Sequence, residues 1–165
     1  MAYKKKIPSN RMRGKRNQSK GVVGECIAAR VLKSMGLRCI RAIYTGWTIK
    51  RNREGKIVGA SPTGQVAGDY NAVAPGGISV LVEVKKKDED RLVYSTLEPH
   101  QHKALYDHHE AGGISLLVWV HENIPYVMRY PIDGFKPRSS IKIEEARWLT
   151  EQLTNDLGIR NNCNE

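Results

Sequence analysis

The sequence lacks any long apolar run and is poor in cysteine. No stretch approaches the roughly 20 consecutive apolar residues that a membrane-spanning helix needs, and the basic N-terminus lacks the apolar segment of a signal peptide. The three cysteines, Cys26, Cys39 and Cys163, are odd in number and widely spread. They suit neither a disulfide framework nor a zinc site, both of which need close pairs. We therefore expect a cytoplasmic protein with reduced thiols and no membrane contact.

Acidic residues are absent from residues 1–20, a segment that holds eight basic ones. Without this arm, the 27 basic residues of the chain fall to 19, against 17 acidic ones. A block of like charge this dense repels itself, so we expect it to be disordered until a polyanion neutralises it. Nucleic acid is the partner that we favour, because each neutralised phosphate releases counterions. Lys15, Arg16 and Lys20 are candidate DNA contacts, and the alternative is a solubilising tail or a targeting signal.

The remaining chain has room for one domain, because it is 165 residues long in total. We place this domain at residues 21–141, followed by a C-terminal helix and tail at 142–165. Within the domain, residues 45–65 are polar and rich in glycine, and they carry a basic cluster that includes Lys50, Arg51 and Arg53. This segment is predicted to be either a protruding ribbon or a mobile loop, and its basic side chains are further candidate DNA contacts.

Apolar spacing predicts three helices. The first runs from Gly21 to Met35 and is closed by Gly36, with an apolar stripe at Val23, Ile27, Val31 and Met35. The second opens at Ser95 as N-cap, with Glu98 as its capping-box partner, and ends near Glu110. Four histidines on it (His100, His102, His108, His109) are expected to face solvent rather than bind zinc. The third runs from Glu144 to Leu157.

Strands are predicted between these helices, over residues 38–44, 66–74, 78–85, 114–121 and 126–130. The order of helices and strands predicts an α/β domain. Its central sheet is expected to be mixed, mostly antiparallel and flanked by helices.

Two acidic residues interrupt the apolar hairpin over residues 66–85. If Pro75-Gly76-Gly77 forms the loop, Ala74 faces Ile78, and counting back places Asp69 opposite Glu83. Directly opposed side chains lie about 4.5–5.5 Å apart at Cβ, so the two carboxylates repel each other. A divalent ion with oxygen ligands would relieve this repulsion, and Mg²⁺ is commonly bound through one or two carboxylates.

Strand periodicity adds Lys85 to this pair. It shares a face with Glu83, while Val80, Val82 and Val84 point to the other face and are expected in the core. A lysine beside a metal-bound water can orient the nucleophile or stabilise charge on a phosphate. The alternative is a surface ion pair between Asp69 and Lys85 with Glu83 solvated. Lys86 and Lys87, which follow directly, are interpreted as phosphate contacts or as a solvated strand end.

Two further polar residues lie on apolar helix faces. Glu25 lies beside small residues of the first helix, and Gln101 lies between Leu97 and Leu105 on the second, so both should point inward. Buried polar residues often only satisfy a local hydrogen bond. Together with the hairpin, however, they predict a set of polar groups that converge on one site.

These residues resemble the pattern of the PD-(D/E)XK nuclease superfamily, in which an acid on one strand is followed by acid-x-Lys on the next. The pattern stands here as Gly68-Asp69-Tyr70 and Glu83-Val84-Lys85. Within the superfamily, the chain looks most like Holliday-junction resolvases of the bacterial RecU type and the archaeal Hjc type. The resemblance runs from about Gly21 to Asp133. The triplet alone is common, but the ordered set of residues is specific.

The resemblance implies a restriction-endonuclease-like core and phosphodiester hydrolysis that depends on Mg²⁺ or Mn²⁺. It implies a homodimer that makes paired nicks in a four-way DNA junction, in a bacterial cell or encoded by a phage. The implied metal ligands are Asp69, Glu83 and the backbone carbonyl of Val84, with Glu25 as an additional acid. Lys85 would orient the attacking water, and Gln101 would be an accessory residue.

The chain departs from the RecU type in two places. Val66-Ala67-Gly68 stands where a Ser or Thr usually precedes the Asp, and residues 45–65 are short for the stalk found at that position. Two other functions remain open from the sequence: a DNA-binding or architectural protein that has lost catalysis on a nuclease fold, and a repair or restriction-like nuclease with another DNA substrate.

Overall fold

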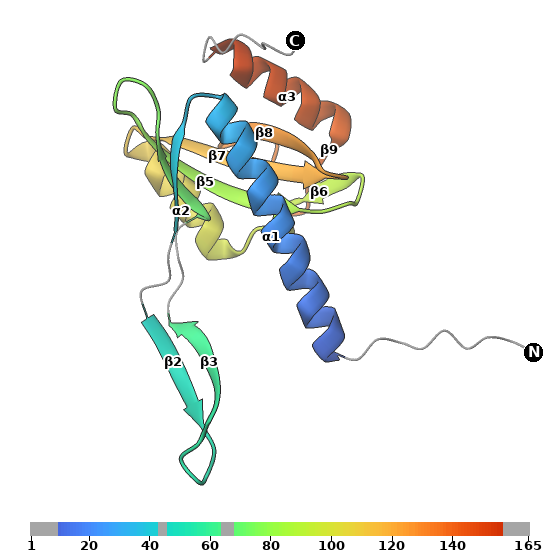
Figure 1. Ribbon diagram of the computed structural model, residues 1–165. Helices are drawn as coiled ribbons and strands as arrows, with labels where there is room; N and C mark the ends of the chain where they lie inside the picture. The colour runs from blue at the N-terminus through green and yellow to red at the C-terminus, as the bar shows by residue number, and fades with distance from the viewer. Residues whose placement is uncertain (1–9, 43–45, 64–67, 157–165) are drawn as a thin grey trace, which may run out of the picture.

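The computed structural model describes the backbone of residues 10–42, 46–63 and 68–156, and the side chains of residues 21–42, 48–59 and 68–156 (Figure 1). A five-stranded sheet in the order β1-β4-β5-β7-β8 forms its centre. The strands are β1 (Arg38–Arg41), β4 (Tyr70–Val73), β5 (Ser79–Lys86), β7 (Ile114–His121) and β8 (Ile124–Tyr130). Neighbouring strands are antiparallel except β5 and β7, which are parallel. The predicted mixed, mostly antiparallel sheet is confirmed.

The two faces of the sheet are covered by different helices. α1 (Asn10–Ser34) packs on the face of Val80 and Val82, whereas α2 (Pro99–Glu110) packs on the face of Leu81. α3 (Ile143–Asp156) packs mainly against β8. All eight residues of β7 are buried, because helices cover this strand on both sides. Helices therefore flank the sheet, as the element order predicts.

The buried face of α1 differs from the predicted stripe. Ala28 and Leu32 are fully buried, whereas Val23 is 44% exposed. The small residues of the helix face the sheet because the two elements lie very close together. A Cβ added at Gly24 would lie only 2.8 Å from the Cβ of Lys86. The predicted apolar stripe therefore lies beside the buried face of α1. The close approach of the helix backbone to β5 determines which residues of α1 contact the sheet.

α1 also begins earlier than predicted, at Asn10 instead of Gly21. Residues 10–20 are thus helical, and not the disordered arm that their charge predicts. A helix that is already formed and packed over its second half extends at low cost per residue, and arginine, lysine, methionine and glutamine are good helix formers. Residues 1–9 of the predicted arm, the side chains of Lys15, Arg16 and Lys20, and the tail at 157–165 lie outside the described residues.

α2 is capped by other residues than predicted. Glu98 is the N-cap, Pro99 is the first helical residue and Gln101 completes the capping box, while Ser95 lies in a 3-10 turn, η1 (Tyr94–Thr96). Proline disfavours a helical conformation in the residue before it and fits the first helical position well, so Pro99 fixes the helix start.

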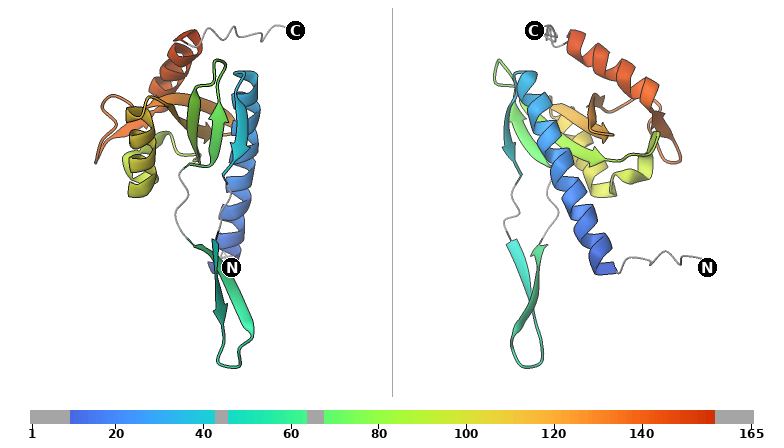
Figure 2. Two further views of the ribbon diagram at one scale, coloured as in Figure 1. Left: turned by 90° about the vertical axis from the view of Figure 1, so that its left-hand side faces the viewer. Right: turned by 45° about the vertical axis from the view of Figure 1, so that its right-hand side comes forward.

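Residues 46–63 form the ribbon that was one of the two predicted alternatives. β2 (Gly46–Arg51) and β3 (Ile57–Thr63) pair with each other and with no strand of the central sheet. Figure 2 shows that the ribbon and the N-terminal half of α1 extend beyond the sheet in the same direction.

A small pair of strands that the sequence did not predict, β6 (Arg91–Val93) with β9 (Ser140–Lys142), borders the sheet on another side. Within the described ranges, no helix is long and apolar enough to cross a membrane.

Gly68 stands where the chain enters β4, and it has a φ of +70°. A Cβ at this position would lie 2.8 Å from the carbonyl oxygen of Val82. We expect Gly68→Ala to lower the free energy of unfolding by roughly 2–4 kcal/mol, because it adds steric overlap to an unfavourable φ. Gly76→Ala is the matched control: its φ is +87° but nothing lies within 4 Å of the added Cβ, so it should cost only about 1 kcal/mol. Urea unfolding measures both; equal losses would contradict the steric argument.

Candidate active site

The β4–β5 hairpin brings Asp69 close to Glu83. The paired residues run from Tyr70 and Val82 to Val73 and Ser79, and the Ala74 N–H donates to the Ile78 carbonyl at 2.9 Å. The predicted facing of Ala74 and Ile78 is confirmed. The paired register ends at Tyr70, because the next residue, Asp69, donates its N–H to the Val82 carbonyl at 2.7 Å. Contrary to the sequence prediction, Asp69 therefore does not continue the ladder opposite Glu83, but its charge lies close enough to raise the pKa of Glu83.

At the end of the β4–β5 ladder, the side chain of Asp69 replaces a backbone group as hydrogen-bond acceptor. In a continued ladder Val84 would pair with Gly68, but the positive φ of Gly68 turns the chain away there. The Val84 N–H instead donates to Asp69 Oδ2 at 2.7 Å. Burial raises the pKa of Asp69, and the hydrogen bond from Val84 and the charge of Lys85 offset part of this rise. The carboxylate is therefore fixed to the backbone of the strand that carries Glu83.

Glu83 is almost completely buried, with an exposed fraction of 2%. Its Oε1 accepts hydrogen bonds from Lys85 Nζ at 2.8 Å and from Gln101 Nε2 at 2.5 Å. Burial, followed by the charge of Asp69, raises the pKa of Glu83 to about 7. The alternative in which Glu83 is solvated and Lys85 pairs with Asp69 at the surface is thus wrong, because Lys85 pairs with a buried Glu83.

Gln101 joins this pair from α2. Besides donating to Glu83, its Oε1 accepts from Lys85 Nζ at 2.8 Å and from the Glu98 N–H at 2.9 Å. The amide thus caps the helix and contacts both charged residues of β5 at the same time. The contacts fix its orientation, because only the amide oxygen can accept and only the amide nitrogen can donate. The sequence predicted correctly that Gln101 points inward.

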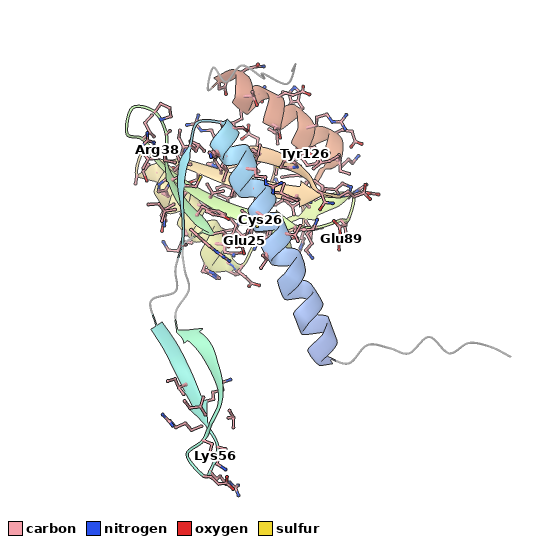
Figure 3. All side chains as sticks on the ribbon, viewed as in Figure 1. Glu25, Cys26, Arg38, Lys56, Glu89 and Tyr126 are labelled. Carbon is pink, nitrogen blue, oxygen red and sulfur yellow. The ribbon has the colours of Figure 1, made fainter. Side chains whose placement is uncertain are left out.

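Glu25 approaches from the other side of the sheet, on α1 (Figure 3). Its carboxylate forms an ion pair with Arg41 of β1, and its backbone carbonyl accepts from the Tyr70 hydroxyl at 3.0 Å. Burial raises the pKa of Glu25, and the charge of Asp69 adds to the rise against the opposing effect of Arg41. Arg41 was not singled out in the sequence. Its register partner is Tyr70, the residue after Asp69, so the β1–β4 pairing brings it to the site.

The donor set fits a hard divalent cation. Asp69 and Glu83 supply carboxylate oxygens; burial and, second to it, the charge of Asp69 raise the pKa of Glu83, and a bound cation would counter both effects. The N–H and C=O of one residue point to the same side of a strand, so the Val84 carbonyl lies on the side of Asp69, past the end of β4. Within the described residues, no group of three or more Asp, Glu, His or Cys side chains could hold a metal. Mg²⁺ commonly uses one or two carboxylates, water and substrate phosphate, which this pair allows.

The predicted DNA contacts are distributed unevenly. Lys50, Arg51 and Arg53 are exposed on the ribbon, and Lys87 is exposed after β5. Lys86 is not available in the same way: its side chain is only 9% exposed, and its Nζ contacts Asn123 at 3.0 Å and Asp88 at 3.6 Å. Strand periodicity turns Lys86 toward α1, away from Lys85. Lys86 is therefore not one of the predicted DNA contacts that face solvent near the site.

His102 was missed as a site-related residue. It was expected to face solvent, but it is only 8% exposed, and its ring contacts the Tyr130 hydroxyl and the Tyr94 carbonyl. No signal in the sequence marks it, because its partners come from two other elements, Tyr94 from η1 and Tyr130 from β8.

The raised pKa of Glu83 has a consequence for stability. Folding moves this pKa from 4.5 to about 7, so the stabilising effect of the protonated carboxyl is complete below pH 4.5 and is lost as the pH rises through about 7. We expect Asp69→Asn to remove the repulsion and to raise the free energy of unfolding of the metal-free protein at pH 8, by on the order of 1 kcal/mol. The gain should be smaller at pH 5, where Glu83 is protonated. Urea unfolding with a chelator measures the difference.

The matched control is Asp107→Asn, since Asp107 is an exposed residue of α2 whose ion pair with Lys103 lies on the surface. This exposed pair should contribute little at either pH. A gain for Asp69→Asn that does not change between pH 5 and pH 8 would contradict the assigned origin of the repulsion.

Neither a protein-family model nor a curated protein sequence matches this chain. Among solved structures, the chain is similar to Hjc, a Holliday junction resolvase from the archaeal hyperthermophile Archaeoglobus fulgidus. The TM-score is 0.48 and the sequences are 15% identical, over 77% of this chain and 97% of that one. At these values, the likeness assigns neither a family nor an activity to the chain.

Proposed function

We propose that this protein is a metal-dependent endonuclease that resolves four-way DNA junctions. One observation carries the proposal: two neighbouring carboxylates, one of them buried, share a site with Lys85 at the end of the hairpin from which the chain leads to a basic ribbon. A protein that only binds DNA gains nothing from acidic residues held together against a phosphate. Such a pair costs stability, so a catalytic use is the better explanation of it.

Each residue of the site has a proposed role. Asp69, Glu83 and the Val84 carbonyl would hold Mg²⁺ or Mn²⁺, with Glu25 as a nearby additional acid. The bound ion would neutralise the carboxylates and stabilise charge on the scissile phosphate. Lys85 would orient the attacking water, and Gln101 would hold the Glu83 and Lys85 side chains in position. This division of roles is that of the PD-(D/E)XK pattern on a restriction-endonuclease-like core.

The ribbon supports a branched substrate over a plain duplex. The chain leaves the central sheet after β1 and returns at Asp69, and the Ala42 N–H donates to the Asp69 carbonyl at 2.8 Å. The chain thus leaves the sheet toward the ribbon, and returns from it, next to Asp69, while Lys56 lies at the far end of the ribbon (Figure 3). Exposed basic residues on such a projection contact phosphates without reading bases, which favours recognition of DNA shape. Two symmetric nicks in one junction would need two such sites, so we propose a homodimer.

The decisive experiment is cleavage of a labelled four-way junction, with a linear duplex of the same arms as substrate control. In Mg²⁺, the native protein should nick the junction in two symmetric strands and leave the duplex intact. Asp69→Asn should abolish cutting, by at least about 100-fold, while junction affinity persists. Asp107→Asn should cut like the native protein.

Other results would assign other functions. Junction binding without cutting in either Mg²⁺ or Mn²⁺ would leave a DNA-binding or architectural protein. Equal cutting of junction and duplex would keep the chemistry and point to a repair or restriction-like nuclease. Sedimentation of the protein with and without junction DNA tests the dimer separately.

Junction affinity should depend on the ribbon. We expect the combined change Lys50→Gln, Arg51→Gln and Arg53→Gln to weaken junction binding. The slope of log affinity against log salt should also become shallower by roughly 2–3, one unit for each lost phosphate contact. Titration at several salt concentrations measures the slope. Lys103→Gln, on the exposed surface of α2, is the control and should leave the slope unchanged. An unchanged slope for the ribbon variant would mean that the ribbon does not contact DNA.

A further inference from the structure

A buried histidine directly follows the glutamine of the site. His102 lies in the first turn of α2, and the Gln101 and His102 N–H groups donate to the same Glu98 carbonyl, at 2.9 and 3.1 Å. The two side chains leave this turn in different directions. Gln101 reaches Glu83 and Lys85, whereas the His102 ring is buried between η1 and β8. Whatever holds His102 therefore holds the turn that carries Gln101.

The partners of His102 define its tautomer. Nε2 lies 3.1 Å from the Tyr94 carbonyl oxygen, which can only accept, so Nε2 carries the hydrogen. In the neutral ring Nδ1 then accepts, and the Tyr130 hydroxyl at 3.0 Å is its donor. Burial lowers the pKa of His102, in agreement with a neutral ring. Both ring nitrogens are thus satisfied by groups from two different elements.

Aromatic packing fixes the ring as well as its hydrogen bonds do. The Tyr94 ring stacks on His102 with centroids 3.8 Å apart and an angle of 12° between the planes. Tyr94 in turn contacts Phe135 edge-on, and its carbonyl also accepts from the Leu97 N–H at 3.2 Å. The histidine therefore joins η1, α2 and β8 at one point directly behind Gln101.

We propose that His102 is a positioning residue, which acts through Gln101 to hold the Glu83 and Lys85 side chains in place. The Gln101 amide makes three hydrogen bonds with fixed donor and acceptor positions, so a small rotation of the first turn of α2 breaks more than one of them. The ring of His102 resists that rotation because it is tied at both nitrogens and on one face. The effect on catalysis rests on the proposed nuclease function, whereas the effect on Gln101 does not.

The test uses two variants of the full chain and one control. Tyr130→Phe removes only the hydroxyl group that donates a hydrogen bond to His102 Nδ1. His102→Gln keeps a donor for the Tyr94 carbonyl but loses the stacked ring and the acceptor at the position of Nδ1. His100→Gln is the matched control, because it makes the same substitution in the same turn at a side chain that makes no described hydrogen bond. Circular dichroism and thermal melts verify that each variant folds.

The first readout needs no activity. In the metal-free native protein, the Gln101 side-chain amide should give a distinct, slowly exchanging NMR signal, identified by its loss in Gln101→Ala. Tyr130→Phe and His102→Gln should each speed its exchange with solvent at least about tenfold, because looser packing opens the hydrogen bond to Glu83 more often. His100→Gln should leave it unchanged. Unchanged exchange in both test variants would overturn the proposal.

The second readout separates positioning from a general loss of stability. His102→Gln should slow single-turnover junction cleavage by about 10-fold without changing junction affinity, as for residues that orient a metal site from behind. In a Gln101→Ala background, the same substitution should cause no further slowing, although its effect on the melting temperature should persist. An equal slowing in both backgrounds would overturn the proposal. If the native protein cuts no DNA, the nuclease function fails and the amide exchange alone decides the role of His102.

Discussion

The arrangement of the site depends on the electrostatic repulsion between two carboxylates at the end of one hairpin. Asp69 and Glu83 lie close together where the β4–β5 ladder ends, and burial makes their mutual repulsion stronger than it would be in water. The surrounding residues hold this pair in place. Lys85 and Gln101 bind Glu83, and the Val84 N–H binds Asp69. The fold thus keeps an unfavourable charge arrangement in a fixed geometry, which is the condition under which such a pair can bind a cation.

The parallel pairing of β5 and β7 explains why a helix can take part in this site. Parallel neighbours need a crossover, and here the crossover carries α2 across the face of the sheet that bears Glu83 and Lys85. The start of α2 is fixed by Pro99, and its capping glutamine lies over the two charged residues. The Gln101 side chain therefore caps α2 and holds Glu83 and Lys85 at the same time. A change in the first turn of α2 affects both, and His102 connects that turn to β8 behind it.

Some of this could be predicted because it depends on short-range chain geometry. The Pro75-Gly76-Gly77 loop and strict strand alternation were enough to face Ala74 with Ile78 and to place Glu83 and Lys85 on one face. The start of α2 was predicted wrongly because two capping patterns overlap in the sequence, and proline decided between them. The buried face of α1 was also wrong: apolar periodicity favours Val23, but the close approach to β5 selects Gly24, Ala28 and Leu32.

By itself, the sequence determined the carboxylate pair, its lysine, the inward glutamine and the basic segment, because each follows from spacing along one or two adjacent elements. Only the tertiary structure decided what surrounds them. Arg41 meets Glu25 through the pairing of β1 with β4, Lys86 is turned away under α1, and His102 is buried between Tyr94 of η1 and Tyr130 of β8. Each of these contacts joins residues of different helices, strands or turns. Their geometry follows from how the helices pack on the sheet, and no local periodicity encodes that packing.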